Sequence, residues 1–258
     1  MFTIKEILER TGAKLVKGSS RGKVSGVSID SRTIKPNELF IAIKGERFDG
    51  HVFTQEASRR GAAAIVFSDK GYEKTALKHA GAIPSLRVKN TVWALGALAY
   101  SYRARFKIPV IAVTGSNGKT TTKEMLKAIL SKRFSVLCNP GTQNNHIGVP
   151  LAVFKLQKKH HLAVIEIGAS RAGEIDRLSW ILQPSAGVIT NIGPAHLESF
   201  KNLQGVFKTK IELTRNLSKD AKLVINQDDR FLSGLNGPDL HRVTFGRSEE
   251  HTSELQSR

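Results

Sequence analysis

The stretch Ile108–Leu126 reads IPVIAVTGSNGKTTTKEML, and it decides the fold of the segment around it. Its apolar run Val110–Val113 predicts a buried β-strand, and residues 121–131 predict an amphipathic helix with an apolar face formed by Met125, Leu126, Ile129 and Leu130. A glycine-rich turn between such a strand and helix directs backbone N–H groups and the positive helix end toward an anion. The stretch therefore predicts a phosphate-binding loop.

The residues expected to bind the nucleotide are Gly115, Ser116, Asn117, Gly118, Lys119, Thr120 and Thr121. Lys119 is expected to neutralise the β- and γ-phosphates, and the Thr120 hydroxyl is expected to reach Mg²⁺. The general spacing G-x-x-x-x-G-K-[ST] requires glycine where Val113 stands, so the loop is a variant form. The alternative is a turn that only caps the helix, but such a turn does not need Gly-Lys-Thr at the helix entry.

The rest of the chain predicts an α/β fold in two units. Apolar strands at 161–168, 186–193 and 221–229 alternate with helix-like segments, which predicts a mostly parallel sheet covered on both faces. We expect a small N-terminal unit at 1–106 and a central ATP-binding unit at 107–247. Residues 248–258 are polar and resemble translated sequencing-adapter read-through, so we expect a non-native tail; a flexible natural tail is the alternative.

Composition narrows the class of protein. The net charge of +18 favours polyanionic partners, although the lysines and arginines are scattered, as on any basic surface. A single cysteine, Cys138, rules out an intrachain disulfide and fits a cytoplasmic protein. No apolar run approaches the roughly 20 residues of a membrane span, so no membrane insertion is expected. An aromatic content of 7% without clusters argues against a nucleic-acid-dependent ATPase, which remains the alternative from another class. We expect a monomer.

Four later stretches complete a pattern with the phosphate loop: NPGTQNNHIGVPLAVF (139–154), AVIEIGASRAGEID (163–176), ITNIGPAHLESF (189–200) and GVFKTKIEL (205–213). Together they resemble the Mur ligase family, ATP-dependent enzymes that add amino acids or peptides to a nucleotide-linked cell-wall precursor. Residues 28–53, SIDSRTIKPNELFIAIKGERFDGHVF, resemble the uridine-nucleotide-binding domain of the same enzymes.

The resemblance implies a reaction. ATP, with Mg²⁺, phosphorylates the carboxylate of the precursor peptide, and an incoming amine attacks the acyl phosphate to form an amide. The variants EIGAS, NNHIGVP and GPAHLE are most similar to the member that joins D-alanyl-D-alanine to UDP-N-acetylmuramoyl-tripeptide; these are the implied partners, with no nucleic acid. A tripeptide-forming or folylpolyglutamate synthase-like member is the alternative. The family has a third, C-terminal domain that this chain does not reach, so we expect retained ligand binding with little or no ligase activity.

The resemblance also assigns residues. The implied catalytic residues are Lys119, Glu166, Asn191, His196 and Lys210, and the implied metal-binding residues are Thr120, Glu166 and His196. The lysine at position 210 corresponds to one that CO₂ carbamylates in the family, although Lys208 is only two residues away. The implied precursor-binding residues are Ser31, Arg32, Lys44, Thr142, Asn144 and Asn145. Turn formation is the alternative for the last three, and an Asp-Ser turn is the alternative at Ser31.

Overall fold

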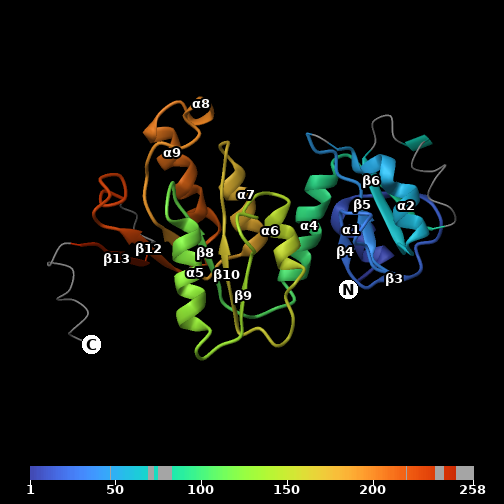
Figure 1. The fold of residues 1–258 in the computed structure, drawn as a ribbon, viewed down its shortest axis with the longest axis horizontal. Helices are drawn as coiled ribbons and strands as arrows, with labels where there is room; N and C mark the ends of the chain where they lie inside the picture. The colour runs from blue at the N-terminus through green and yellow to red at the C-terminus, as the bar shows by residue number, and fades with distance from the viewer. Residues whose placement is uncertain (47, 69–72, 75–82, 219, 236–240, 248–258) are drawn as a thin grey trace. The chain divides into compact units, whose positions relative to one another are not determined.

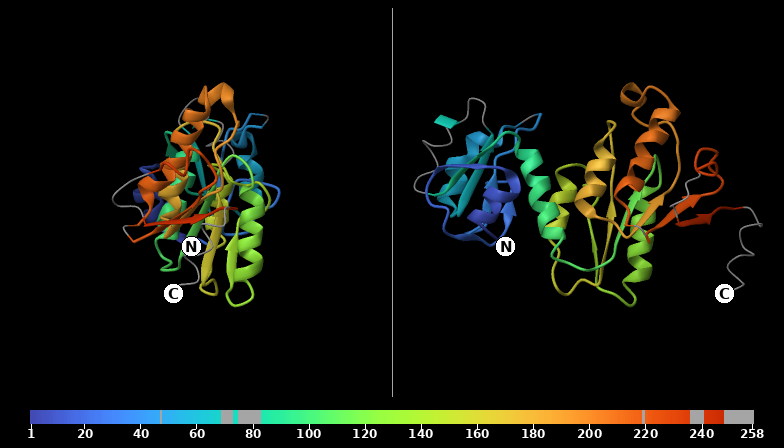
Figure 2. Two further views of the ribbon diagram at one scale, coloured as in Figure 1. Left: turned by 90° about the vertical axis from the view of Figure 1, so that its left-hand side faces the viewer. Right: turned by 180° about the vertical axis from the view of Figure 1, so that it is seen from behind.

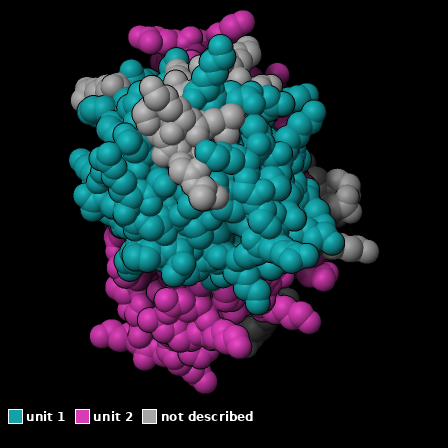
Figure 3. Space-filling view, turned by 90° about the vertical axis from the view of Figure 1, so that its right-hand side faces the viewer, with its two compact units in different colours: residues 1–102 teal, residues 103–258 magenta. Residues whose placement is uncertain are grey.

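The structure is a computed structural model, and it describes residues 1–46, 48–68, 73–74, 83–218, 220–235 and 241–247. The chain forms two compact units, Met1–Tyr102 and Arg103–Arg258 (Figure 3). The sequence places the boundary after residue 106, whereas residues 103–106 lie in the second unit. The expected tail, 248–258, lies outside the described residues. None of the described helices combines the length and apolar character needed to cross a bilayer.

The first unit is built on a five-stranded sheet in its described residues, with strand order β2-β7-β6-β5-β4. Only β2 runs antiparallel to its neighbour; the other pairings are parallel. The strands of this unit are β1 (Phe2–Thr3), β2 (Lys14–Lys17), β3 (Lys23–Val24), β4 (Val27–Ser28), β5 (Leu39–Ile41), β6 (Ala64–Ser68) and β7 (Ser85–Val88). Its helices in the described residues are α1 (Ile4–Thr11), η1 (Gly50–Phe53), α2 (Thr54–Arg59) and α4 (Thr91–Arg103), and the last residue of α4 belongs to the second unit.

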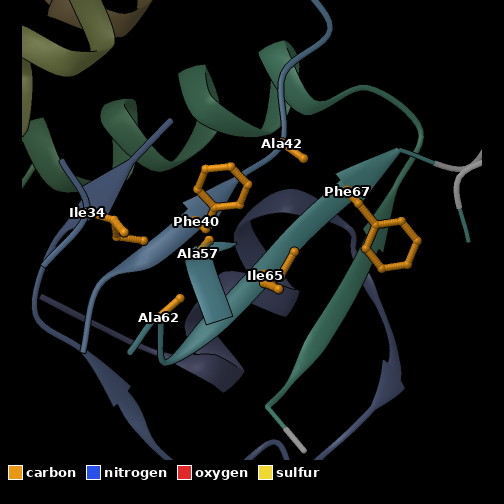
Figure 4. Packing of buried hydrophobic residues seen from close by; sticks show 7 residues of the cluster. All are labelled: Ile34, Phe40, Ala42, Ala57, Ala62, Ile65 and Phe67. Atoms are coloured by element: carbon orange, nitrogen blue, oxygen red, sulfur yellow. The ribbon is translucent and has the colours of Figure 1, made fainter. Parts of the chain in front are cut away.

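The core of the first unit lies where β5, β6 and α2 meet. Phe40 on β5 and Ile65 and Phe67 on β6 are fully buried, and Ala57 of α2 packs with them (Figure 4). Alternate residues of a strand point to opposite faces, so Ile65 and Phe67 lie on the same face of β6. Leu39 and Ile41 of β5 and Val66 of β6, which point to the other face, are also 0% exposed, so the apolar runs of this segment are buried on both faces of the sheet.

The second unit carries a six-stranded sheet in its described residues, with order β13-β12-β11-β8-β10-β9 (Figure 1). All five strand pairings are parallel, which confirms the expected sheet type. Its strands are β8 (Val110–Thr114), β9 (Val136–Cys138), β10 (Leu162–Glu166), β11 (Ala186–Ile189), β12 (Lys222–Asn226) and β13 (His241–Phe245). Its helical segments are α5 (Lys119–Leu130), α6 (Gly148–Val153), α7 (Glu174–Leu182), α8 (Leu197–Phe200), α9 (Leu203–Lys210) and η2 (Ile211–Asn216).

The order of these strands reverses the direction of winding at β8. From β8 the chain moves across β10 to β9, and after β10 it returns to the other side of β8 to form β11 (Figure 2). Right-handed crossovers then place α5 and α7 on opposite faces of the sheet. Parallel sheets bind ligands where the direction of winding reverses, at the carboxyl ends of the strands. This point lies between β8 and β11, directly beside the predicted phosphate loop.

Helix α5 packs differently from the sequence-based expectation. Leu126 and Leu130 pack against the core cluster around Val113 and Val164, as expected. Met125 and Ile129 are 60% and 67% exposed, so placing them on the packed face was wrong. Residues three or four apart share one helix face, and the buried residue that continues the face of Leu126 and Leu130 is Lys123. The positively charged Lys123 thus occupies a buried position of α5 at which the apolar pattern predicts no charged residue.

Candidate nucleotide and metal site

The predicted phosphate loop forms between β8 and α5. Gly115 has φ +145° and Gly118, the residue before α5, has φ +77°, a region that L-residues with side chains rarely adopt. A Cβ built on Gly115 would lie 2.0 Å from Thr190 Oγ1, so a side chain there would displace the end of β11. Glycine is therefore required at position 115 by both backbone conformation and space.

Lys119 lies in the first turn of α5 and folds back over the loop. Its Nζ donates to the carbonyl oxygens of Gly115 (3.0 Å) and Ser116 (2.8 Å). Burial lowers the pKa of Lys119, and the nearby Glu166 carboxylate opposes that effect. The ammonium thus lies at the loop itself, beside the positive end of a helix, where an anionic phosphate is stabilised.

Glu166 ends β10 with its side chain 1% exposed, and two side chains hold its carboxylate. Thr120 Oγ1 donates to Glu166 Oε2 at 2.8 Å, and Asn144 Nδ2 donates to Glu166 Oε1 at 2.7 Å. A hydroxyl and a carboxylate are hard oxygen donors, and Mg²⁺ is commonly held by one or two such groups together with substrate phosphates. The two residues therefore fit a Mg²⁺ ion that accompanies a nucleotide in the loop.

Two further residues shape the site and escaped the sequence analysis. Asn139 directly follows β9, and its side chain bonds to the end of β10. Its Oδ1 accepts from the Glu166 backbone N–H (2.9 Å), and its Nδ2 donates to the Glu166 carbonyl (3.0 Å). The Lys123 Nζ donates to the carbonyls of Asn139 (2.9 Å) and Gly141 (3.1 Å). The available signal for Lys123 was its helical spacing, three residues after Thr120 and four after Lys119.

The loop after β11 is joined to the phosphate loop. Asn191 accepts from the Asn117 backbone N–H at 2.9 Å and donates from Nδ2 to the Asn117 carbonyl at 3.1 Å. The Ser116 hydroxyl donates to the Gly193 carbonyl (2.8 Å) and accepts from the Gly193 N–H (2.9 Å). Asn191 thus lies against the phosphate loop, and a nucleotide bound there would be close to its side chain.

His196 lies further along the same segment, exposed, with a left-handed backbone (φ +48°). Its ring meets Phe200 edge-on, with the ring centroids 6.2 Å apart. No cluster of three or more His, Cys, Asp or Glu side chains suited to a metal occurs in the described residues. The metal role of His196 therefore stays a prediction.

Lys210 ends α9 and is buried, whereas Lys208 is exposed. Burial lowers the pKa of Lys210 to about 8, and the positive charge of Lys119 contributes, while Glu174 and Glu212 oppose the shift. A neutral amine is the form that reacts with CO₂, so Lys210 is the better suited of the two lysines. Its carbamylation itself stays a prediction.

The remaining predicted residues occupy varied settings. Thr142 is exposed. Asn145 Oδ1 accepts from the N–H groups of Ile147 (3.1 Å) and Gly148 (2.9 Å), so this side chain has the turn-forming role that was the alternative to precursor binding. In the first unit Ser31 is buried and Lys44 is exposed. Their contacts with a precursor stay predictions.

Arg32 in the first unit already has an anionic partner. Its Nε and Nη2 donate to the two carboxylate oxygens of Asp30, at 3.0 and 2.7 Å. These bonds lower the pKa of Asp30 to about 2. A diphosphate would therefore have to compete with Asp30 for the exposed Arg32 guanidinium, and this proposed contact stays a prediction.

These features define a phosphate-loop protein with its site at the carboxyl edge of a parallel sheet. The Mur ligase middle-domain model matches residues 113–258, and the model described as "Mur ligase family, catalytic domain" matches residues 23–103. The chain belongs to the Mur ligase family.

Named relatives extend this result. The chain is 37% identical over 255 residues to the UDP-N-acetylmuramoyl-tripeptide–D-alanyl-D-alanine ligase of Bacillus subtilis, covering 98% of this chain and 54% of that one. A crystal structure of MurF from Acinetobacter baumannii aligns with a TM-score of 0.84 at 33% identity, over 96% of this chain and 53% of that one. MurF of Thermotoga maritima, solved in complex with ADP, aligns with a TM-score of 0.77 at 34% identity, over 86% and 50%. The chain spans about half the length of the relatives it matches.

Proposed function

We propose that this chain is the precursor- and ATP-binding part of a ligase that joins D-alanyl-D-alanine to UDP-N-acetylmuramoyl-tripeptide in the cytoplasm. The observation that carries the proposal is the 2.8 Å contact between Thr120 Oγ1 and Glu166 Oε2 beside the phosphate loop. The contact brings a loop hydroxyl and a strand-end carboxylate to the place where a Mg–nucleotide complex would lie. The choice of substrates is supported by the likeness to the Bacillus subtilis enzyme, whose name specifies them.

The chemistry demands positive charge in this place. A peptide carboxylate and a triphosphate repel each other, and they must come within bonding distance for the γ-phosphoryl group to transfer. Lys119 and the N-terminus of α5 would stabilise the phosphates, and Thr120 and Glu166 would hold Mg²⁺. The bound Mg²⁺ would neutralise phosphate charge and orient the phosphoryl group. The acyl phosphate formed on the substrate is then attacked by the dipeptide amine, which releases phosphate.

The other residues have proposed roles around this centre. Asn191 would contact the nucleotide, His196 would contribute to a second Mg²⁺ site, and Lys210 would act as its carbamate. Carbamylation would convert the buried Lys210 from a cation into an anion. The carbamate could then contact the metal ion or the phosphoryl group. Ser31, Arg32 and Lys44 would hold the uridine diphosphate, and Thr142, Asn144 and Asn145 would lie nearest the precursor in the second unit.

Binding is the direct test of this proposal. We expect this chain to bind ADP more tightly in Mg²⁺ than in EDTA, and to bind UDP-N-acetylmuramoyl-tripeptide in isothermal titration. Nucleotide binding that is unaffected by Lys119→Ala, or a failure to bind the precursor, would contradict the proposal. ATP hydrolysis stimulated by single-stranded DNA or RNA, and not by the precursor, would favour the nucleic-acid-dependent alternative.

A product assay separates the alternatives within the family. Because little or no ligase activity is expected of this chain alone, the assay uses a longer form, of the length of the Bacillus subtilis relative, incubated with ATP and Mg²⁺. One reaction contains UDP-N-acetylmuramoyl-tripeptide and D-alanyl-D-alanine, and the other contains the corresponding dipeptide precursor and a diamino acid. Amide formation only in the first reaction supports the proposal, whereas amide formation only in the second identifies a tripeptide-forming enzyme.

A further inference from the structure

Lys123 is a buried cation that the proposed reaction leaves without a role. Its side chain is 0% exposed, and Nζ lies 4.0 Å from Glu166 Oε2 and 3.1 Å from Glu124 Oε1. An ammonium has three N–H donors, and the carbonyls of Asn139 and Gly141 together with Glu124 account for them. Burying a lysine is costly unless it is paired, so this arrangement requires an explanation beyond helix formation.

The carbonyls that Lys123 binds belong to the segment that holds Glu166. Asn139 bonds the backbone N–H and carbonyl of Glu166, and Asn144 on the same segment donates to Glu166 Oε1. The Asn144 side chain lies against Gly168, where an added Cβ would be only 2.9 Å from it, so glycine at position 168 leaves the room that this contact needs. Lys123 therefore fixes the segment from which both the backbone and the carboxylate of Glu166 are held.

Charge gives Lys123 a second link to Glu166. A buried carboxylate needs a nearby positive charge or several hydrogen-bond donors to stay stable away from water. The donors are the Thr120 hydroxyl and the Asn144 amide, and Lys123 adds a full positive charge at 4.0 Å. This charge acts from inside the protein, on the side of the carboxylate next to α5.

We propose that Lys123 is a positioning residue that orients the Glu166 carboxylate toward the divalent cation of the nucleotide complex. The inference rests on the proposed function, because it concerns the same nucleotide site. Lys123 itself does not touch the nucleotide, since its side chain is fully buried and its donors are directed to Asn139, Gly141 and Glu124. It acts through Glu166 and therefore affects the Mg²⁺ requirement of nucleotide binding.

The test compares Lys123→Met with Lys127→Met. Lys127 lies one turn further along α5, is half exposed, and also pairs with Glu124, at 3.5 Å, so it is a matched control. Fluorescently labelled ADP is titrated at increasing Mg²⁺ concentrations and in EDTA. Lys123→Met is expected to raise the Mg²⁺ concentration for half-maximal enhancement about tenfold, the change that loss of one charge-assisted contact produces. Its affinity in EDTA should change less than about twofold, and Lys127→Met should match the wild type.

Two results would overturn the inference alone: an unchanged Mg²⁺ midpoint in a folded Lys123→Met protein, or an equal loss of affinity with and without Mg²⁺. The second result would mean that the lysine only supports the loop. If the wild type binds no ADP under any condition, the proposed function fails, and the inference fails with it.

A second measurement applies even if Lys123→Met folds poorly. The urea midpoint of unfolding is measured for Lys123→Met, Glu166→Gln and the double variant. Because Lys123→Met removes the fully buried positive charge 4.0 Å from Glu166, adding Glu166→Gln should recover part of the lost midpoint. A double variant that is no more stable than Lys123→Met would show that Lys123 acts independently of Glu166, which contradicts the proposal.

Discussion

Thr120 and Glu166 are 46 residues apart in the chain, and their side chains meet at 2.8 Å. Thr120 is the second residue of α5, which follows β8, and Glu166 ends β10, the strand paired with β8 in parallel register. Parallel pairing brings the carboxyl ends of neighbouring strands to one sheet edge, so the contact is a consequence of topology. The proposed metal site therefore depends on the register between β8 and β10.

Replacing Lys119 by methionine tests the phosphate loop. The ammonium is held at the loop by the Gly115 and Ser116 carbonyls, and we expect it to contact the phosphates when a nucleotide binds. Loss of charge-assisted hydrogen bonds of this kind costs about 1.5–3 kcal/mol, so ADP affinity should fall roughly 10- to 100-fold. Calorimetric titration of Lys119→Met measures this change, with Lys127→Met as the control. An affinity within twofold of the wild type would count against the loop assignment.

The two loop glycines should respond differently to alanine. Both have positive φ, but a Cβ at Gly118 meets nothing within 4 Å, whereas one at Gly115 meets Thr190 Oγ1 at 2.0 Å. Gly118→Ala should cost about 1 kcal/mol of unfolding free energy from backbone strain, and Gly115→Ala should cost at least about 2 kcal/mol more from the clash. Urea unfolding of the two variants measures the difference. Equal stabilities would contradict the close approach of the loop to β11.

The buried amine of Lys210 predicts a pH effect on stability. Its pKa falls from 10.5 to about 8 on folding, mainly through burial, so the unfolded chain binds the proton more tightly. The resulting destabilisation is complete below about pH 8 and disappears as the pH rises to 10.5. The unfolding free energy of the wild type relative to Lys210→Met should therefore rise by up to about 3 kcal/mol across this range. Lys208→Met, at an exposed site, should show no such difference from the wild type.

Arg103 at the start of the second unit should be important for its stability. The side chain is 7% exposed, and its guanidinium donates to the carbonyls of Leu182, at the end of α7, Phe106 and Ile108. Arg103→Met leaves these acceptors without their donor and should cost roughly 2–4 kcal/mol of unfolding free energy. Thermal and urea unfolding measure the loss, and the exposed Lys132→Met is the control. A loss below about 0.5 kcal/mol would show that water replaces the guanidinium.

The parts of the fold that sequence predicted were those that depend on local pattern. The strand at Val110, the turn and the start of α5 follow from apolar periodicity and glycine placement within a dozen residues. The parallel sheet follows from the alternation of strands and helices. Pairing Thr120 with Glu166 was supported by family resemblance, because no local pattern reveals which strand ends become neighbours.

The misplaced residues share a physical cause. A lysine in a helix is usually solvated, so periodicity favoured Met125 and Ile129 for the packed face over Lys123. Only the three-dimensional structure shows the Asn139 and Gly141 carbonyls that receive its ammonium. The choice between Lys208 and Lys210 likewise depends on burial, since both carry the same side chain in the same helix.

The paired hydrogen bonds between Asn117 and Asn191 make the two loops thermodynamically linked. A nucleotide that changes the strength of this pair when it binds the phosphate loop would be coupled to any second ligand that changes it from the Asn191 side, and each would alter the affinity of the other by the same factor. A small molecule that separates the two asparagines would weaken nucleotide binding without entering the phosphate loop, which makes the junction a target distinct from the nucleotide itself.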